Sequence, residues 1–307
     1  MRTRTRASVW LAGAVAGWFA PTVAADALLG ADRGKLLLTA GFTSIEGAGG
    51  GGLTSWALVT GYGSSSSWGA NVHTTGIALR DFDYRSFGAG VGVLDRVELS
   101  FSRQMLDATA GVLDRVSLSQ DIFGAKVRLL GDAVYAQDSW VPQLAVGALF
   151  KRHRGIDGGA QAGFPGLVSV KQLGASDDEG VDYYLSATKI SLSHNLLTNV
   201  TLRLSDANQF GLLGFGGDRN DGRSLQAEAS VGYLLRRSLV IGFEYRARAR
   251  RLDVDDESDA WDAFVAWAPS RSVSVVAAYV NLGSIAAPIG GSSSDQGGAY
   301  LSAQIGF

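Results

Sequence analysis

The sequence lacks several features on which common classes of protein depend. Of its 307 residues none is cysteine, 5 are proline and 18% are charged. The absence of cysteine excludes a disulfide framework, a thiol nucleophile and cysteine-ligated metal centres. Lysine and arginine form no sustained cluster, which excludes a nucleic-acid-binding protein, and an apolar fraction of 46% excludes a disordered chain.

The first 25 residues are expected to direct export. Three arginines among the first six residues precede an apolar stretch, residues 7–20, and small residues at 23–25 resemble a cleavage site. This order is typical of a secretory signal peptide. We therefore expect residues 1–25 to be removed and residues 26–307 to form a single domain.

Beyond this leader, no run of 18 apolar residues could form a transmembrane helix. Instead, apolar residues recur at every second position. Residues 300–307 (YLSAQIGF) follow this pattern, and so do residues 225–235 and 239–248 on either side of a tight turn at 236–238. The alternation is typical of transmembrane β-barrel strands, whose outward residues are apolar and whose inward residues are polar.

The same alternation, followed along the whole chain, predicts an all-β fold. The predicted fold is a transmembrane antiparallel up-and-down β-barrel of about fourteen strands, with twelve or sixteen as alternatives. Short connections alternate with longer ones, as periplasmic turns and extracellular loops do. A soluble β-sandwich is the rival fold, but it would need a second layer to cover so many one-sided apolar strands. The predicted strands are 35–43, 53–61, 68–78, 85–93, 96–104, 120–130, 141–152, 181–191, 197–205, 224–235, 239–248, 260–268, 272–282 and 299–307.

Five stretches have distinctive sequences: IEGAGGGGLTSWALVTGYG (45–63), GVGVLDRVELSFSRQ (90–104), DAVYAQDSWVPQLAVGALFKR (132–152), SDANQFGLLGFGGDRNDG (205–222) and FVAWAPSRSVSVVAAYVNLG (264–283). Together they resemble an uncharacterised Gram-negative family, domain of unknown function 3034, of exported, outer-membrane barrel-like proteins. The resemblance implies this fold and an outer-membrane location, and the family has no catalytic motif to transfer. Separately, the terminal Phe307 is similar to the assembly signal of outer-membrane proteins, which implies the barrel-assembly machinery as a partner.

Charged residues on the polar faces of the predicted strands are expected to line the lumen, because a basic side chain facing lipid costs about 2–4 kcal/mol at the midplane. They are Glu98, Lys126, Arg128, Asp182, Arg203, Glu228, Glu244, Arg246, Arg248 and Asp262. Both signs occur in similar number, which favours a passive or gated pore for small polar solutes. The alternative is a non-conducting barrel, sealed by a salt-bridge network, with a structural or ligand-binding role.

Two glycine-rich segments are candidates for special roles. The loop 206–223 contains an apolar and glycine run that would be unusual on a solvated loop, so that it could form a constriction or gate, or else an extended strand that covers its own loop. The glycine tract 47–52 is predicted to be a flexible loop, because no Lys-Ser/Thr pair follows it as in a phosphate-binding loop. The gate residues are Phe210, Leu212, Leu213, Phe215 and Asp218.

No enzymatic activity, metal or cofactor is expected. An acid–base site needs a carboxylate or hydroxyl within reach of a histidine. His153 has Asp157 nearby in sequence, so a barrel hydrolase using His153 is the least favoured alternative, whereas His73 and His194 fit polar lumen and turn positions. The expected partners are outer-membrane lipid, lipopolysaccharide, the assembly machinery and small polar solutes.

Overall fold

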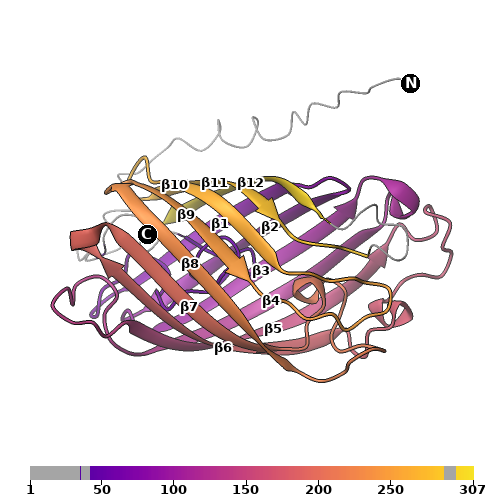
Figure 1. Ribbon diagram of the computed structural model, residues 1–307, viewed down its shortest axis with the longest axis horizontal. Helices are drawn as coiled ribbons and strands as arrows, with labels where there is room; N and C mark the ends of the chain where they lie inside the picture. The colour runs from indigo at the N-terminus through magenta and orange to yellow at the C-terminus, as the bar shows by residue number, and fades with distance from the viewer. Residues whose placement is uncertain (1–34, 36–41, 287–294) are drawn as a thin grey trace. The chain divides into compact units, whose positions relative to one another are not determined.

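The computed structural model describes Lys35, residues 42–286 and residues 295–307. These residues form a closed barrel of twelve antiparallel strands (Figure 1). The predicted all-β barrel is confirmed, with twelve strands rather than fourteen. The predicted signal peptide, residues 1–25, lies outside the described residues.

Each strand pairs with its neighbours in sequence, and the last strand pairs with the first to close the barrel. The strands are Trp68–Ala78 (β1), Phe82–Val93 (β2), Val97–Ala108 (β3), Ser117–Leu130 (β4), Gln143–Asp157 (β5), Glu179–Ser191 (β6), Leu196–Ser205 (β7), Ser224–Arg236 (β8), Leu239–Arg246 (β9), Ala260–Trp267 (β10), Val273–Asn281 (β11) and Gly297–Gly306 (β12). Four short 3₁₀ helices lie in the connections: Gly111–Leu113 (η1), Val170–Leu173 (η2), Leu192–His194 (η3) and Gln209–Gly211 (η4).

One of the fourteen predicted strands is not a strand of the barrel wall, because the segment 53–61 lies inside the barrel. Another predicted strand, 35–43, falls mostly outside the described residues. The physical reason is that residues 53–61 are buried at every position, whereas a wall strand must present every second side chain outward. The other twelve predicted strands overlap β1 to β12.

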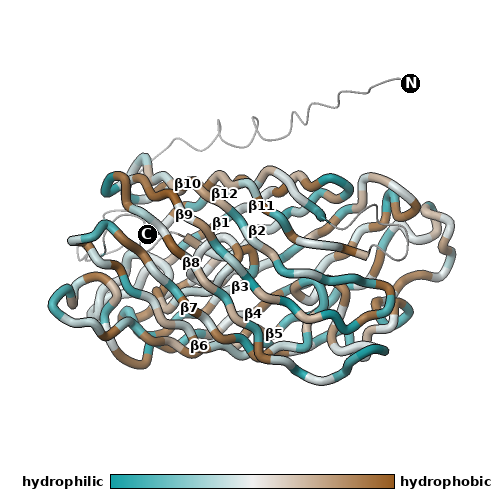
Figure 2. Tube along the Cα trace, viewed as in Figure 1, coloured by the Kyte–Doolittle hydropathy of each residue, from teal (hydrophilic) through white to brown (hydrophobic). Residues whose placement is uncertain are grey.

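Burial alternates along the strands as the sequence pattern requires. In β7 the outward residues Val200 and Leu202 are 55% and 42% exposed, whereas the inward residues Thr201 and Arg203 are fully buried. The tube in Figure 2 changes between hydrophobic and hydrophilic colours along the strands in the same way. The barrel thus has an apolar outer surface and a polar interior.

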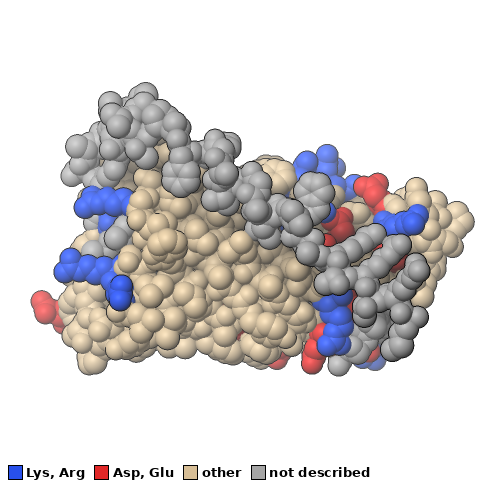
Figure 3. Space-filling model, turned by 90° about the horizontal axis from the view of Figure 1, so that it is seen from above, with Lys and Arg blue, Asp and Glu red and all other residues tan. Residues whose placement is uncertain are grey.

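The connections gather at two ends of the barrel. On the face seen in Figure 3, acidic and basic side chains lie toward these two ends, and the band between them carries other residues. No helix in the described part of the chain has the length and hydrophobicity needed to span a membrane. We call the end with turns 94–96, 131–142, 192–195, 237–238 and 268–272 the short-turn end, and the end with connections 79–81, 109–116, 158–178, 206–223, 247–259 and 282–296 the long-loop end.

Candidate functional site: a plugged lumen

A segment that precedes the first strand, residues 42–63, occupies the interior of the barrel, and we call it the plug. All of residues 43–63 are buried except Gly52, which is half-buried. About eight strands make a barrel that side chains alone can fill. A barrel of twelve strands has room for a length of chain as well, and the small residues of the plug suit such a space.

The backbone of the plug is bound by charged side chains of β3 and β4. Glu98 accepts hydrogen bonds from the backbone N–H groups of Gly49 (2.9 Å) and Thr60 (2.8 Å). Lys126 donates to the backbone carbonyls of Gly49 and Leu58, both at 2.8 Å, and pairs with Glu98 at 3.1 Å. This ion pair therefore satisfies polar groups of the plug that form no regular sheet.

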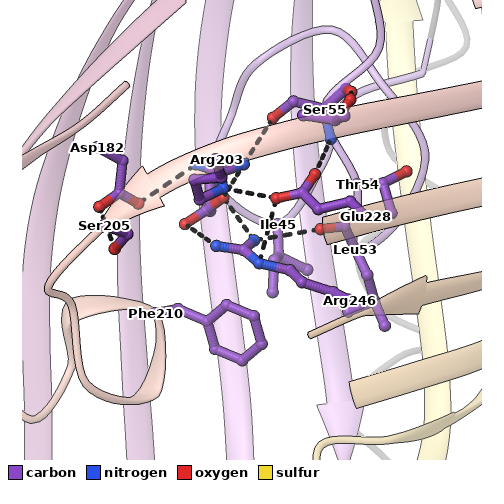
Figure 4. A network of polar contacts seen from close by, with 12 residues as sticks. Ile45, Leu53, Thr54, Ser55, Asp182, Arg203, Ser205, Phe210, Glu228 and Arg246 are labelled. Atoms are coloured by element: carbon purple, nitrogen blue, oxygen red, sulfur yellow. Dashed lines mark hydrogen bonds and ion pairs between the residues drawn. The ribbon is translucent and has the colours of Figure 1, made fainter. Parts of the chain in front are cut away.

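Ser55 is held by the opposite part of the wall. Its backbone N–H donates to Glu228 at 3.0 Å, and its carbonyl accepts from the hydroxyls of Ser186 (3.0 Å) and Thr201 (2.6 Å). Its hydroxyl accepts a hydrogen bond from Arg203 at 3.0 Å. All three polar groups of one plug residue are thus paired with side chains of the wall. Figure 4 shows the contacts of Ser55 with Glu228 and Arg203.

Glu46 on the plug joins an ionic cluster at the centre of the lumen. Its carboxylate lies 2.5 Å from Lys151, 2.7 Å from Arg246 and 3.3 Å from Arg203. Two carboxylates of the wall complete the cluster. Asp182 lies 2.6 Å from Lys151 and 3.2 Å from Arg203, and Glu228 lies 2.5 Å from Arg203 and 3.4 Å from Arg246.

The cluster is balanced only when the plug is in place. Three cations face three carboxylates, and each of these side chains is at most 3% exposed. Buried charges are tolerated when they are paired and hydrogen-bonded. Without Glu46 this cluster would keep three cations and two carboxylates, so the plug contributes the charge that neutralises the cluster.

Gly51 in the glycine tract packs where a side chain would clash with the wall. A Cβ on Gly51 would lie 1.6 Å from the carboxylate of Glu244, which accepts from the Leu53 N–H (2.7 Å), the Thr54 hydroxyl (2.7 Å) and the Ser230 hydroxyl (2.8 Å). The prediction of a flexible loop at 47–52 is wrong, because these residues lie in the barrel and are fixed by its wall.

The loop 206–223 packs into the barrel at the long-loop end. Phe210, Leu212, Leu213 and Phe215 are each at most 5% exposed, and the Phe210 carbonyl accepts from Lys151 at 3.0 Å. The ring of Phe210 lies 4.6 Å from the guanidinium of Arg246. Asp218 is exposed and accepts a hydrogen bond from the N–H of Asp253. The apolar run therefore covers the ionic cluster, and Asp218 lies outside this cover.

The remaining predicted lumen residues are distributed as follows. Glu98, Lys126, Asp182, Arg203, Glu228, Glu244, Arg246 and Asp262 are buried inside the barrel. Arg128 lies near the short-turn end beside Asp132, and Arg248 lies beyond β9 among the long loops, where it donates to Gln209 at 2.8 Å. Sequence reasoning missed Glu46 and Lys151. The signal for Glu46 was available, because it is the one charged residue between Leu36 and Gly63.

The three histidines were the residues considered for a barrel hydrolase. The Nδ1 atom of His153 accepts from the Gly155 N–H at 2.9 Å, and no hydrogen bond joins its ring to a carboxylate or hydroxyl within the described residues. The Nδ1 atom of His194 lies 2.8 Å from the Ser191 hydroxyl on an exposed turn. His73 is buried on the inner face of β1.

A scan of family models finds the family described as "Protein of unknown function (DUF3034)" over residues 39–304. The chain belongs to this family. The resemblance inferred from the five sequence stretches is thereby confirmed. Among curated proteins, none matches this DUF3034 protein.

Solved structures similar to this DUF3034 protein include outer-membrane barrels of different kinds. The KdgM porin is 8% identical, with 77% of this chain and 99% of that chain covered and a TM-score of 0.46. The NanC porin is 6% identical, with 77% and 98% covered and a TM-score of 0.47. Outer membrane phospholipase A from Escherichia coli is 9% identical, with 80% and 94% covered and a TM-score of 0.39.

One carboxyl group at the long-loop end is expected to make the loop contacts depend on pH. Glu257 accepts from the Gln209 N–H at 3.0 Å and lies 3.4 Å from Arg248. Burial raises the pKa of Glu257 to about 7, although Arg248 opposes this shift. Because the pKa of Glu257 in the folded protein is above its ordinary value, the protonated carboxyl group favours the folded loop. Its contribution to stability is fully present below about pH 4.5 and is lost as the pH rises to about 7.

Amide hydrogen exchange of residues 247–259, corrected for its intrinsic pH dependence, measures this effect. Protection should fall between pH 5 and pH 7.5, by up to about tenfold per pH unit below the folded pKa. Glu257→Gln keeps a neutral side chain and should show a weaker dependence. An equal dependence in both proteins would assign the effect to another group.

Proposed function

We propose that the protein is a pore for small polar solutes in the outer membrane of a Gram-negative bacterium, and that the plug closes this pore in the described state. The apolar outer surface and the charged ends of the barrel support a membrane-spanning position. Outer-membrane lipid and lipopolysaccharide would contact the outer surface, and the barrel-assembly machinery would insert it.

The proposal that the plug opens and closes the pore rests on the path of the plug. Lys35, which precedes it, pairs with Asp95 at 2.8 Å in a turn of the short-turn end. Tyr62, near its other limit, donates its N–H to the Phe307 carbonyl at the same end, at 2.7 Å. Because Lys35 and Tyr62, on either side of the buried residues 43–61, both contact the short-turn end, we propose that the plug leaves the lumen through that mouth.

The inner surface supports transport of polar solutes. Removal of the plug would expose side chains that now bind its backbone, namely carboxylates, ammonium groups, guanidinium groups and hydroxyls of the wall. Such a lining solvates small polar molecules. We propose transport rather than catalysis, because the ring of His153 has no carboxylate or hydroxyl partner among the described residues.

Planar-bilayer conductance of the refolded protein tests the proposal. The wild type should be mostly closed. Gly51→Val should raise the open fraction by roughly tenfold or more, because the new side chain must displace Glu244, and each hydrogen bond of a charged group contributes about 1.5–3 kcal/mol. Gly76→Val is the matched control, since a Cβ at Gly76 meets nothing within 4 Å.

The outcomes separate the two candidate functions. A wild type that is continuously open would show that the plug does not close the lumen. If the wild type and Gly51→Val both fold and neither conducts, the protein is a sealed barrel with a structural or ligand-binding role.

A further inference from the structure

The buried charges of the inner wall are confined to eight neighbouring strands, from β3 to β10. In contrast, no buried lysine, arginine, aspartate or glutamate is found on the described residues of β11, β12, β1 and β2. These four strands are neighbours in the closed barrel, and we call them the neutral sector.

The plug forms fewer hydrogen bonds with the neutral sector than with strands β3 to β10. Within the described residues, its hydrogen bonds to the neutral sector are few. The Tyr84 hydroxyl donates to the Ile45 carbonyl at 3.1 Å, and the Tyr62 N–H donates to Phe307, next to the end of β12. The other plug contacts described above go to strands from β3 to β10. A movement of the plug away from the neutral sector would therefore break few hydrogen bonds.

Three side chains of the neutral sector have unused hydrogen-bonding groups. Asn71, His73 and Gln304 are 1%, 5% and 2% exposed, and both polar side-chain atoms of each have no hydrogen-bond partner among the described residues. His73 lies directly opposite Gln304 across the β1–β12 seam, and Asn71 is the next inward residue of β1. An unpaired buried polar group costs about 1–3 kcal/mol, so a cluster of three indicates a partner that enters from outside the chain.

The contact between the plug and this cluster involves no hydrogen bond. Gly90 lies opposite Asn71 on β2, and a Cβ there would meet the methyl group of Thr60 of the plug at 2.9 Å. The Thr60 hydroxyl is itself unpaired. Thr60 thus presents its methyl group to this part of the wall, and neither its hydroxyl nor the Asn71 amide has a hydrogen-bond partner among the described residues. Separation of the two surfaces would allow each to find one.

The cluster has the donor and acceptor pattern of a site for neutral hydroxyl groups. Each amide offers one acceptor oxygen and two N–H donors, and a neutral imidazole offers one of each. A hydroxyl group can donate and accept, so it complements all three side chains. A charged solute would lose hydration here without meeting an opposite charge, which is costly in a buried site.

We infer that the pore opens between the plug and the neutral sector, and that Asn71, His73 and Gln304 bind small uncharged polyols such as monosaccharides there. This inference rests on the proposed function as a pore. To the proposed pore it adds a route for the solute, between the plug and the neutral sector, and a class of solute, small uncharged polyols.

Uptake of radiolabelled solutes into proteoliposomes tests the inference in a Gly92→Val protein. A Cβ on Gly92 of β2 would lie 2.2 Å from the Thr60 carbonyl, so the new side chain should push the plug away from the neutral sector. Glucose, gluconate and glucosamine are similar in size and differ in charge. Glucose should enter fastest. Adding Asn71→Leu and Gln304→Leu should lower glucose uptake severalfold, because each lost hydrogen bond contributes about 0.5–1.5 kcal/mol.

Two further variants make the test specific. Gln226→Leu removes a buried amide from β8, outside the neutral sector, and should leave glucose uptake unchanged. Asn71→Asp places a charge in the cluster and should shift the preference toward glucosamine, which supplies a second result if the double leucine variant does not fold.

The failures are distinguishable. If Gly92→Val conducts ions but glucose uptake is insensitive to the leucine variants, or if the charged sugars enter as fast as glucose, the route and solute class are wrong and the pore stands. If neither Gly51→Val nor Gly92→Val conducts or takes up any solute, the proposed function fails and the inferred site fails with it.

Discussion

Replacement of Arg203 by methionine should lower the free energy of unfolding by about 3–5 kcal/mol. Arg203 is fully buried and contacts three carboxylates, Glu46, Asp182 and Glu228. Methionine would leave these carboxylates with two cations, and an uncompensated buried charge is strongly destabilising. Urea unfolding of the protein in lipid vesicles, followed by tryptophan fluorescence, gives the measurement.

An exposed ion pair supplies the matched control for this experiment. Arg85 pairs with Asp107 on the outer side of β2 and β3, with side chains 65% and 28% exposed. Because exposed pairs contribute about 0–1 kcal/mol, Arg85→Met should change the unfolding free energy little. Equal losses in the two variants would mean that the central cluster contributes no more than a surface ion pair.

Deletion of Phe307 should remove most of the correctly inserted barrel without reducing export. The Phe307 carbonyl accepts from Tyr62 at 2.7 Å and from Ala70 at 3.2 Å, and its N–H donates to the Ala70 carbonyl at 2.8 Å. The deletion therefore removes the contacts that join the end of β12 to β1 and to the plug, in addition to the expected assembly signal. The yield of heat-modifiable barrel in outer-membrane fractions is the readout.

A substitution separates the backbone contacts from the aromatic ring. Phe307→Ala keeps the backbone N–H and carbonyl but removes the ring, which is the feature similar to an assembly signal. If the ring carries the signal, both variants should lose insertion. Normal yield from the deleted protein would contradict both roles of Phe307.

The wall of the barrel could be predicted because its signal is local. In β7, for example, the outward residues from Val200 to Leu204 are apolar and the inward residues from Asn199 to Ser205 are polar, so that the strand and its inner face follow from the alternation alone. The same reasoning identified Arg203 and Glu228 as inward residues. The number of strands was harder to predict, because the plug segment 53–61 has a composition similar to that of a wall strand over its nine residues.

The plug could not be predicted because its determinants are distant in sequence. Glu46 meets Arg246 across 200 positions, and the Leu53 N–H meets Glu244 across 191 positions. A tract of glycine has no side-chain periodicity, and a fixed position in a lumen and a flexible loop leave the same pattern. Only the pairing of Glu46 with the wall distinguishes a glycine tract that is fixed in the lumen from one in a flexible loop.

These separations also constrain the order in which the protein can form. The plug is synthesised before every strand of the wall, yet its binding surface is assembled from strands as distant as β9 and from the end of β12. Contacts of such high sequence separation form late and slowly, because the intervening chain must first be ordered. Docking of the plug therefore cannot be complete until β9 and the end of β12 are in place, so that the residues made first in the described barrel are among the last to reach their native contacts.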